Sequence, residues 1–160
     1  MNVSIDTQEY GLPDFTLLGE SLALMAQCDL YRFRSIDQFG AVILPPMRLG
    51  QFRIWRRGGV AVALATWAYL DEKTEAAVLE GDEPLAPEDW ACGDRPVVMD
   101  LVAPFGDGFA ASRDLVRTVF PRIAFKAVRR SADGDARRIV QFAGITADGE
   151  KVAPSSRIAA

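Results

Sequence analysis

The residue that most clearly suggests chemistry is a carboxylate inside an apolar run. Asp100 interrupts the stretch from Val97 to Ala103, which is otherwise hydrophobic and is bounded by turn signals. The run predicts a buried strand, and side-chain alternation places Asp100 on one face with Val98 and Val102. Burying a carboxylate between valines without a partner is costly. Two interpretations follow: either Asp100 faces a polar cleft at a functional site, or an edge strand points it into water.

The chain contains no histidine, and this restricts the proton-transfer chemistry open to it. Its absence excludes a Ser-His-Asp arrangement and most catalytic zinc sites. Proton transfer must then fall to Asp, Glu, Tyr, Lys or Cys. Cys28 and Cys92 stand alone in the sequence, so they offer no metal-ligand spacing and one disulfide at most. We therefore expect no bound metal and no bound cofactor.

The composition indicates one domain in a reducing compartment. Of 160 residues 49% are hydrophobic, and the net charge of −4 argues against general nucleic-acid binding. The few cysteines and the lack of a basic-then-apolar leader predict a cytoplasmic location. The longest apolar run, Gly58 to Leu70, is too short to span a bilayer. We expect a flexible arm over residues 1–13, one domain over 14–150 and a frayed tail over 151–160.

Apolar residues at helical spacing predict four helices. The expected segments begin after Asp14 as the N-cap, run from Ser35 to about Leu44, from Asp71 to Glu80, and from Phe109 to Phe120. In the first, Leu18, Leu22 and Met25 form the core stripe, and in the last it is Phe109, Val116 and Phe120. Pro45-Pro46 is expected to end or bend the second helix. The acidic stretch from Asp71 to Asp94 indicates a solvated face.

Two pairs of apolar runs predict two hairpins, one before and one after the Asp100 strand along the chain. Gln51 to Arg56 and Val60 to Leu70 are joined by a Gly-Gly turn, and Trp67 is expected in the core. Ile123 to Val128 and Arg138 to Ala143 are joined by a turn at 133–135. Hairpins mixed with helices favour an α/β (α+β mixed) fold with a mixed central sheet flanked by helices.

Three stretches resemble the toxin-activating lysine acyltransferases of bacteria. PEDWACGDR (87–95) matches the family's DWxSGDR signature, MDLVAPFGD (99–107) matches xDWIAPFGD, and FPRIAFKAVRR (120–130) matches FPDxxFRAIR. Upstream, Leu18-Gly19, Leu44-Pro45, Gln51-Phe52 and ATWAYL (65–70) fall in step with the family. The resemblance covers about Leu18 to Gly144, most of the chain.

The resemblance implies a GNAT-like fold and a defined reaction. Members of the family take a fatty acyl group from acyl carrier protein and place it on internal lysine ε-amines of an RTX-type protoxin. They work in the bacterial cytoplasm and are often homodimers. The family's catalytic pair is a His after the first helix and an Asp that corresponds to Asp100. The position of the His is Tyr31 here, in CDLYR (28–32), and the family's Trp after the Asp is Leu101.

Without the histidine, three interpretations stay open. In the first, the enzyme is active, with Asp100 as base and Tyr31 as a hydrogen-bonding or proton-relay partner. In the second, Cys28 is a nucleophile that accepts the acyl chain. In the third, the chain is a catalytically weak relative that binds an acyl carrier or the toxin. The residues of the resemblance favour an acyltransferase.

Arg129 occupies the position of the Arg in the family's AIR segment. It is a candidate substrate-binding residue together with Cys28: it either steadies a carboxylate such as Asp100, holds the phosphopantetheine arm, or is a surface cation on a strand. The chain from Arg113 to Arg138 is mostly basic. This segment suits an acidic carrier protein by charge complementarity, or it is simply solvated.

Overall fold

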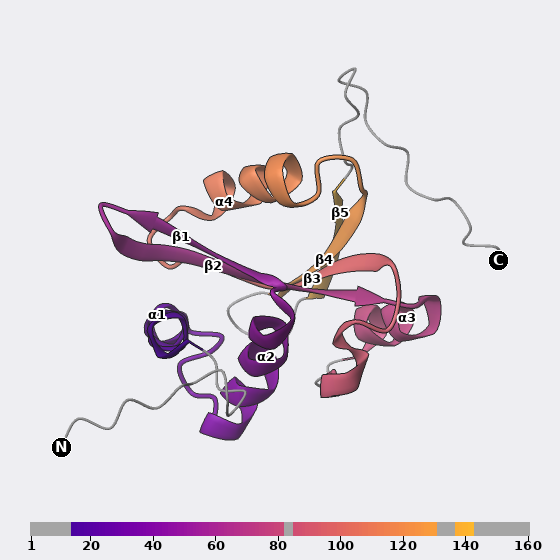
Figure 1. Ribbon diagram of the computed structural model, residues 1–160, viewed down its shortest axis with the longest axis horizontal. Coiled ribbons are helices and arrows are strands. Elements are labelled where there is room, and N and C mark those ends of the chain that lie inside the picture. The colour runs from indigo at the N-terminus through magenta and orange to yellow at the C-terminus, as the bar shows by residue number, and fades with distance from the viewer. Residues whose placement is uncertain (1–13, 82–84, 131–136, 143–160) are drawn as a thin grey trace.

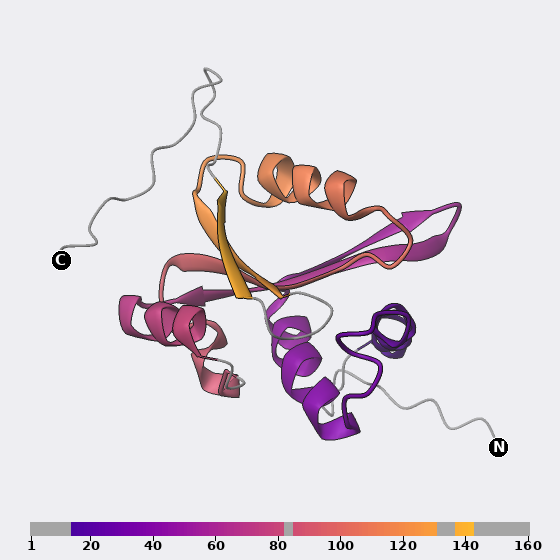
Figure 2. The ribbon, with the colours of Figure 1, turned by 180° about the vertical axis from the view of Figure 1, so that it is seen from behind.

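The computed structural model describes residues 14–81, 85–130 and 137–142 as one five-stranded sheet with helices on both faces (Figure 1). The predicted arm, the tail and the turn at 133–135 lie outside the described residues. Helices α1, α2 and α3 lie on one side of the sheet and α4 on the other, as Figure 2 also shows from behind. Within these three ranges no helix has the length and apolar character needed to cross a membrane.

The strands follow chain order across the sheet, from β1 to β5. Their bounds are Phe52–Arg57, Val60–Leu70, Arg95–Val102, Phe125–Arg130 and Arg137–Phe142. All neighbouring strands are antiparallel except β3 and β4, which are parallel. The predicted mixed sheet with flanking helices is confirmed. The finer GNAT-like assignment is compatible with this topology and stays a prediction.

The β1–β2 hairpin forms as the sequence predicts. Gly58 and Gly59 have φ angles of 58° and 82°, a backbone that suits the tight turn between two twisted strands. Trp67 on β2 is 7% exposed and belongs to the core, as expected. The register of β1 against β2 shifts after Trp55, near the turn.

Helices α1 and α2 run over Phe15–Ala26 and Ile36–Leu49. The N-cap prediction is confirmed, because the Asp14 carboxylate accepts hydrogen bonds from two backbone N–H groups of the first turn. The core stripe of α1 is only partly as predicted: Met25 is buried, whereas Leu22 is 45% exposed. Ser21 and Leu24 lie buried instead.

Helix α2 continues through Pro45-Pro46, so of the two predicted alternatives, an end or a bend at these prolines, the end is wrong. The helix ends at Gly50, whose φ of 66° is the left-handed cap conformation that glycine favours. Both prolines are buried against the rest of the fold. Their packing offsets the backbone hydrogen bonds that proline cannot donate.

Helix α3, Glu72–Glu80, contributes a carboxylate that forms ion pairs with both β3 and β4. Glu75 is 6% exposed, and its carboxylate contacts Lys126 of β4 at 3.0 Å and Arg95 of β3 at 3.2 Å. The expectation that the acidic stretch forms a solvated face is therefore wrong at Glu75. The carboxylate is buried because two cations from neighbouring strands compensate its charge. A short 3-10 helix, Pro87–Trp90, precedes β3.

Helix α4 covers Gly108–Asp114 and passes into a π-helical turn, Leu115–Val119. The predicted stripe on this helix is wrong, since Phe109 is 79% exposed while Phe120 is fully buried just past the helix end. A π turn holds more residues than an α turn, and it rotates the residues that follow relative to a regular helix. Phe120 thus turns into the core against Trp67.

Candidate functional site

A cavity of about 790 Å³ opens where β3 and β4 cease to pair. The two parallel strands match only at Val97 with Lys126 and at Val98 with Ala127. Past these pairs the cavity is lined by both strands, by the loop after α1, by α4 and by β5. Its lining residues are Gln27, Cys28, Asp29, Leu30, Tyr31, Val98, Met99, Asp100, Leu101, Gly108, Phe109, Ser112, Leu115, Phe125, Ala127, Val128, Val140 and Phe142. The volume is that of a typical small-ligand site, roughly 300–1,000 Å³.

Asp100 lies on a central strand and is 5% exposed, so the interpretation of an exposed edge strand is wrong. The predicted alternation also fails at Val98. Thr66 pairs with Asp100 and Trp67 with Val98, which leaves Met99 without a partner in β2. This irregularity has the effect of a β-bulge and changes the phase of the side chains. Val98 packs in the core cluster on the α4 face, whereas Asp100 turns towards the α1–α2 loop.

Two hydroxyl groups hold the Asp100 carboxylate. The phenol of Tyr31 donates to Oδ1 at 2.5 Å, and the hydroxyl of Thr66 donates to Oδ2 at 3.2 Å. Among the side chains that the structure describes, which do not include those of residues 129, 130, 137 and 138, no ion pair joins Asp100 to a Lys or Arg. A buried carboxylate that has neutral donors but no paired cation is stabilised less than one in an ion pair.

Tyr31 reaches the carboxylate because the chain turns tightly after α1. The Tyr31 amide donates to the carbonyl of Cys28 at 3.0 Å, and the ring packs among core residues that include Met25 and Ile43. Tyr31 is 9% exposed. The guanidinium of Arg34 lies 5.0 Å from the centre of its ring. The structure therefore joins the two predicted catalytic residues, which are 69 positions apart, through a buried hydrogen bond.

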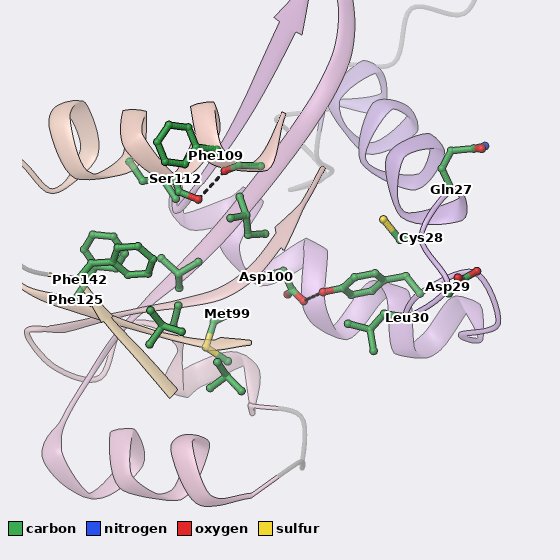
Figure 3. Close-up of a pocket in the computed structure, with 18 residues that line it drawn as sticks. Gln27, Cys28, Asp29, Leu30, Met99, Asp100, Phe109, Ser112, Phe125 and Phe142 are labelled. Carbon is green, nitrogen blue, oxygen red and sulfur yellow. Dashed lines mark hydrogen bonds between the residues drawn. The ribbon is translucent and has the colours of Figure 1, made fainter. Parts of the chain in front are cut away.

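Cys28 lines the same cavity as Asp29 and Asp100, and Figure 3 shows the three side chains. Burial, and then the negative charge of Asp29, raise the pKa of the Cys28 thiol above its ordinary value. The thiol therefore stays protonated near neutral pH, which makes it a poor nucleophile. This environment disfavours the interpretation in which Cys28 accepts the acyl chain.

Arg129 is in β4, opposite Arg138 of β5 and next to Val128, which lines the cavity. Its side chain lies outside the described part of the structure, so its substrate-binding role stays a prediction. In the described ranges no three acidic or sulfur-bearing side chains cluster closely enough to hold a metal ion.

Thr66 is the site residue that sequence reasoning missed. It is fully buried in β2 and contributes the second hydrogen bond to Asp100. A hydroxyl within the run from Val60 to Leu70 was a usable signal, because a buried hydroxyl needs a hydrogen-bond partner. The partner itself becomes evident only when β2 and β3 are paired.

The fold and the site together define a class of protein: an α/β domain with a hydrogen-bonded phenol–carboxylate pair in the wall of a cavity. Comparison with known proteins assigns the family. Residues 11–143 match the RTX toxin acyltransferase family, and the chain belongs to that family.

Three relatives are 29–32% identical to this chain over the aligned residues. It is 32% identical to the RTX-I toxin-activating lysine-acyltransferase of Actinobacillus pleuropneumoniae, over 81% of this chain and 75% of the relative. It is 32% identical to a protein-lysine myristoyltransferase of Escherichia coli, over 80% and 73%. A protein-lysine palmitoyltransferase of Bordetella bronchiseptica is 29% identical over 84% and 74%. The predicted family is confirmed.

Proposed function

We propose that this protein is a lysine acyltransferase that moves a fatty acyl group from acyl carrier protein to internal lysine ε-amines of an RTX-type protoxin. Family membership supports the reaction class. The single structural observation that carries the proposal is the 2.5 Å hydrogen bond between Tyr31 and Asp100 in the wall of an apolar cavity. The cavity shields an acyl thioester from water, and the pair handles the proton that aminolysis releases.

The proposed mechanism begins with the deprotonation of the target lysine. Its ammonium group has a reference pKa of about 10.4, so it must first lose one proton, which passes to solvent water, before the neutral amine attacks. The neutral amine then adds to the thioester carbonyl, a C–N bond forms and the C–S bond breaks. The Tyr31 oxygen accepts the proton that leaves the nitrogen while its own proton passes to Asp100. The same relay in reverse delivers a proton to the departing carrier thiolate, so the site returns to its starting state.

The positive charge of the segment from Arg113 onward supports acyl carrier protein as the acyl donor. Arg113 lies in α4, Arg117 in the π-helical turn and Arg122 between that turn and β4, all in the mostly basic segment of the sequence. Acyl carrier proteins are acidic, and opposite charges steer and orient such a complex. Screening by salt weakens contacts of this kind, so transfer at limiting carrier concentration should fall as ionic strength rises.

The test is a transfer assay with palmitoyl acyl carrier protein and a protoxin fragment, read by mass spectrometry of the lysines. We expect acyl-lysine from the wild-type protein and none above background from Asp100→Asn. Asp94→Asn is the matched control, because Asp94 is exposed and does not line the cavity. If the wild-type protein forms no acyl-lysine with any saturated donor, the proposal fails.

A second function, binding of the acyl carrier or toxin without efficient transfer, is not favoured by the relatives, which are named as acyltransferases, and rests only on the residue type at position 31. A phenol has a reference pKa of about 10, whereas an imidazole at the position of Tyr31 would have one of about 6.5 and would be a better resting base near pH 7. Tyr31→His separates the two functions. A modest gain over an active wild type supports the acyltransferase, while activity that appears only in this variant supports the binding protein.

A further inference from the structure

The cavity has two ends of unlike character. Cys28, Asp29 and Asp100 give one end its polar groups, whereas the space between α4 and the β4–β5 hairpin is apolar. The apolar end is lined by Phe109, Leu115, Phe125, Ala127, Val140 and Phe142. Figure 3 shows Phe125 and Phe142 across the cavity from Cys28 and Asp29, with Asp100 between them.

The apolar end offers a ligand no free hydrogen-bonding side chain among the described residues that line it. Among the described residues that line this end, the one hydroxyl is that of Ser112, and it already donates to the carbonyl of Gly108 at 2.6 Å. A lysine ammonium or a peptide placed there would lose its hydration without a hydrogen-bond partner. A hydrocarbon chain makes no hydrogen bonds to water that it could lose, and its transfer from water into an apolar cavity lowers the free energy.

Two stacked phenylalanines close this end. The rings of Phe125 and Phe142 have centroids 4.8 Å apart and lie within 13° of parallel. Phe125 is 2% exposed and also packs on Phe120 at 4.7 Å, and Phe120 in turn contacts Trp67. Phe142 therefore rests against a chain of core aromatics. A wall supported in this way cannot retreat without disturbing the core, so it sets a fixed depth.

We propose that the fatty acyl chain lies in the apolar end of the cavity and that the wall formed by Phe125 and Phe142 sets the preferred chain length. The inference rests on the proposed function, since the thioester carbon must lie beside Tyr31 and Asp100 for transfer. The chain then runs from that point under α4 towards Phe142. Chains that reach the wall gain from each buried methylene group, and longer chains must bend back into water.

Three variants probe the wall. Phe142→Ala deepens the apolar end, whereas Ala127→Leu fills it from the middle of β4, so the two changes are expected to shift the preference in opposite directions. The matched control is Tyr69→Leu. Tyr69 contacts Phe120 of the same aromatic cluster, at 6.5 Å between ring centroids, but it does not line the cavity.

The experiment measures binding of acyl carrier proteins that bear octanoyl to stearoyl chains through a non-hydrolysable amide, by titration calorimetry on the full chain. Each methylene that finds apolar space is worth about fourfold in affinity. Phe142→Ala should shift the tightest-binding chain at least one two-carbon step longer, and Ala127→Leu should shift it shorter. Tyr69→Leu should keep the wild-type optimum.

The inference is overturned if Phe142→Ala and Ala127→Leu, shown to be folded by circular dichroism, both keep the wild-type optimum of acyl chain length. It is also overturned if Tyr69→Leu shifts that optimum as much as they do. A binding affinity that does not depend on chain length would overturn it as well. Failure of the proposed function has a different signature. In that case the thioester donors yield no acyl-lysine, while the chain-length preference in binding and its shifts remain.

Discussion

Replacing Asp100 by asparagine should abolish acyl transfer and at the same time make the fold more stable. The side chain is 5% exposed, and its oxygens accept hydrogen bonds only from Tyr31 and Thr66 among the described residues. An asparagine of the same shape keeps its carbonyl oxygen towards Tyr31. Its amide group then donates to the Thr66 hydroxyl, which rotates to accept. Both hydrogen bonds survive, and the buried negative charge disappears.

The expected magnitude follows from two opposing effects at Asp100. Desolvation of a buried ion costs several kcal/mol, and no ion pair within the described part of the chain offsets that cost. Against this, each of two hydrogen bonds weakens by about 1 kcal/mol when it no longer involves a charge. The net gain is about 2 kcal/mol. For a chain of this size it raises the melting temperature by about 4–8 °C.

Thermal unfolding followed by circular dichroism measures this prediction, with Asp94→Asn as the control. Asp94 is exposed, so its substitution should move the free energy of unfolding by no more than about 0.5 kcal/mol. The reasoning is refuted if Asp100→Asn folds but unfolds several degrees below the wild-type protein. That result would make the carboxylate a structural anchor and remove the argument that the fold tolerates its cost for the sake of function.

Three further predictions concern neighbouring groups. Thr66→Val removes one hydroxyl hydrogen bond from the site carboxylate and should lower the transfer rate with carrier affinity unchanged; a wild-type rate would show that this bond positions nothing. In a Cys92→Ser background, the rate at which iodoacetamide labels Cys28 should rise with a midpoint at higher pH in the folded than in the urea-unfolded chain. The reason is that burial and a neighbouring carboxylate raise the pKa of the Cys28 thiol. An equal or lower midpoint in the folded chain contradicts this prediction. Glu75→Gln should cost about 2 kcal/mol in urea unfolding, since it leaves Lys126 without its carboxylate, and no loss would mean that the ion pair is dispensable.

Local sequence signals predicted much of the fold. The Gly58-Gly59 turn between two apolar runs specifies a hairpin by backbone conformation alone, and Asp14 before an amphipathic run specifies a helix start. Both features depend on residues within a few positions of one another, so the chain itself carries the information.

The features that sequence reasoning missed depend on contacts between distant segments. Pro45 and Pro46 stay helical because the fold buries them, and Met99 is left unpaired because β2 and β3 shift register. The π turn before Phe120 has the same character, since core packing and not local propensity turns that ring inward. Neither periodicity nor propensity can anticipate such effects.

The residues of the candidate site likewise fall into those that the sequence indicated and those that only the structure revealed. The apolar surroundings of Asp100 identified it from the sequence, and the family resemblance identified Tyr31 as its companion. Thr66 and the Phe125–Phe142 wall needed the sheet, because only strand pairing brings them to the cavity. The catalytic roles of Asp100 and Tyr31 and the substrate-binding role of Arg129 stay predictions.

The central claim is that the Tyr31 phenol carries the proton between the target lysine and Asp100. Single-turnover acyl transfer by Tyr31→Phe tests it most directly, because the substitution removes one oxygen and leaves the packed ring in place. We expect a rate at least about a hundredfold below that of the wild-type protein, with unchanged affinity for the acyl carrier. A wild-type rate in this variant would contradict the account, since no phenol oxygen would then take part in the transfer.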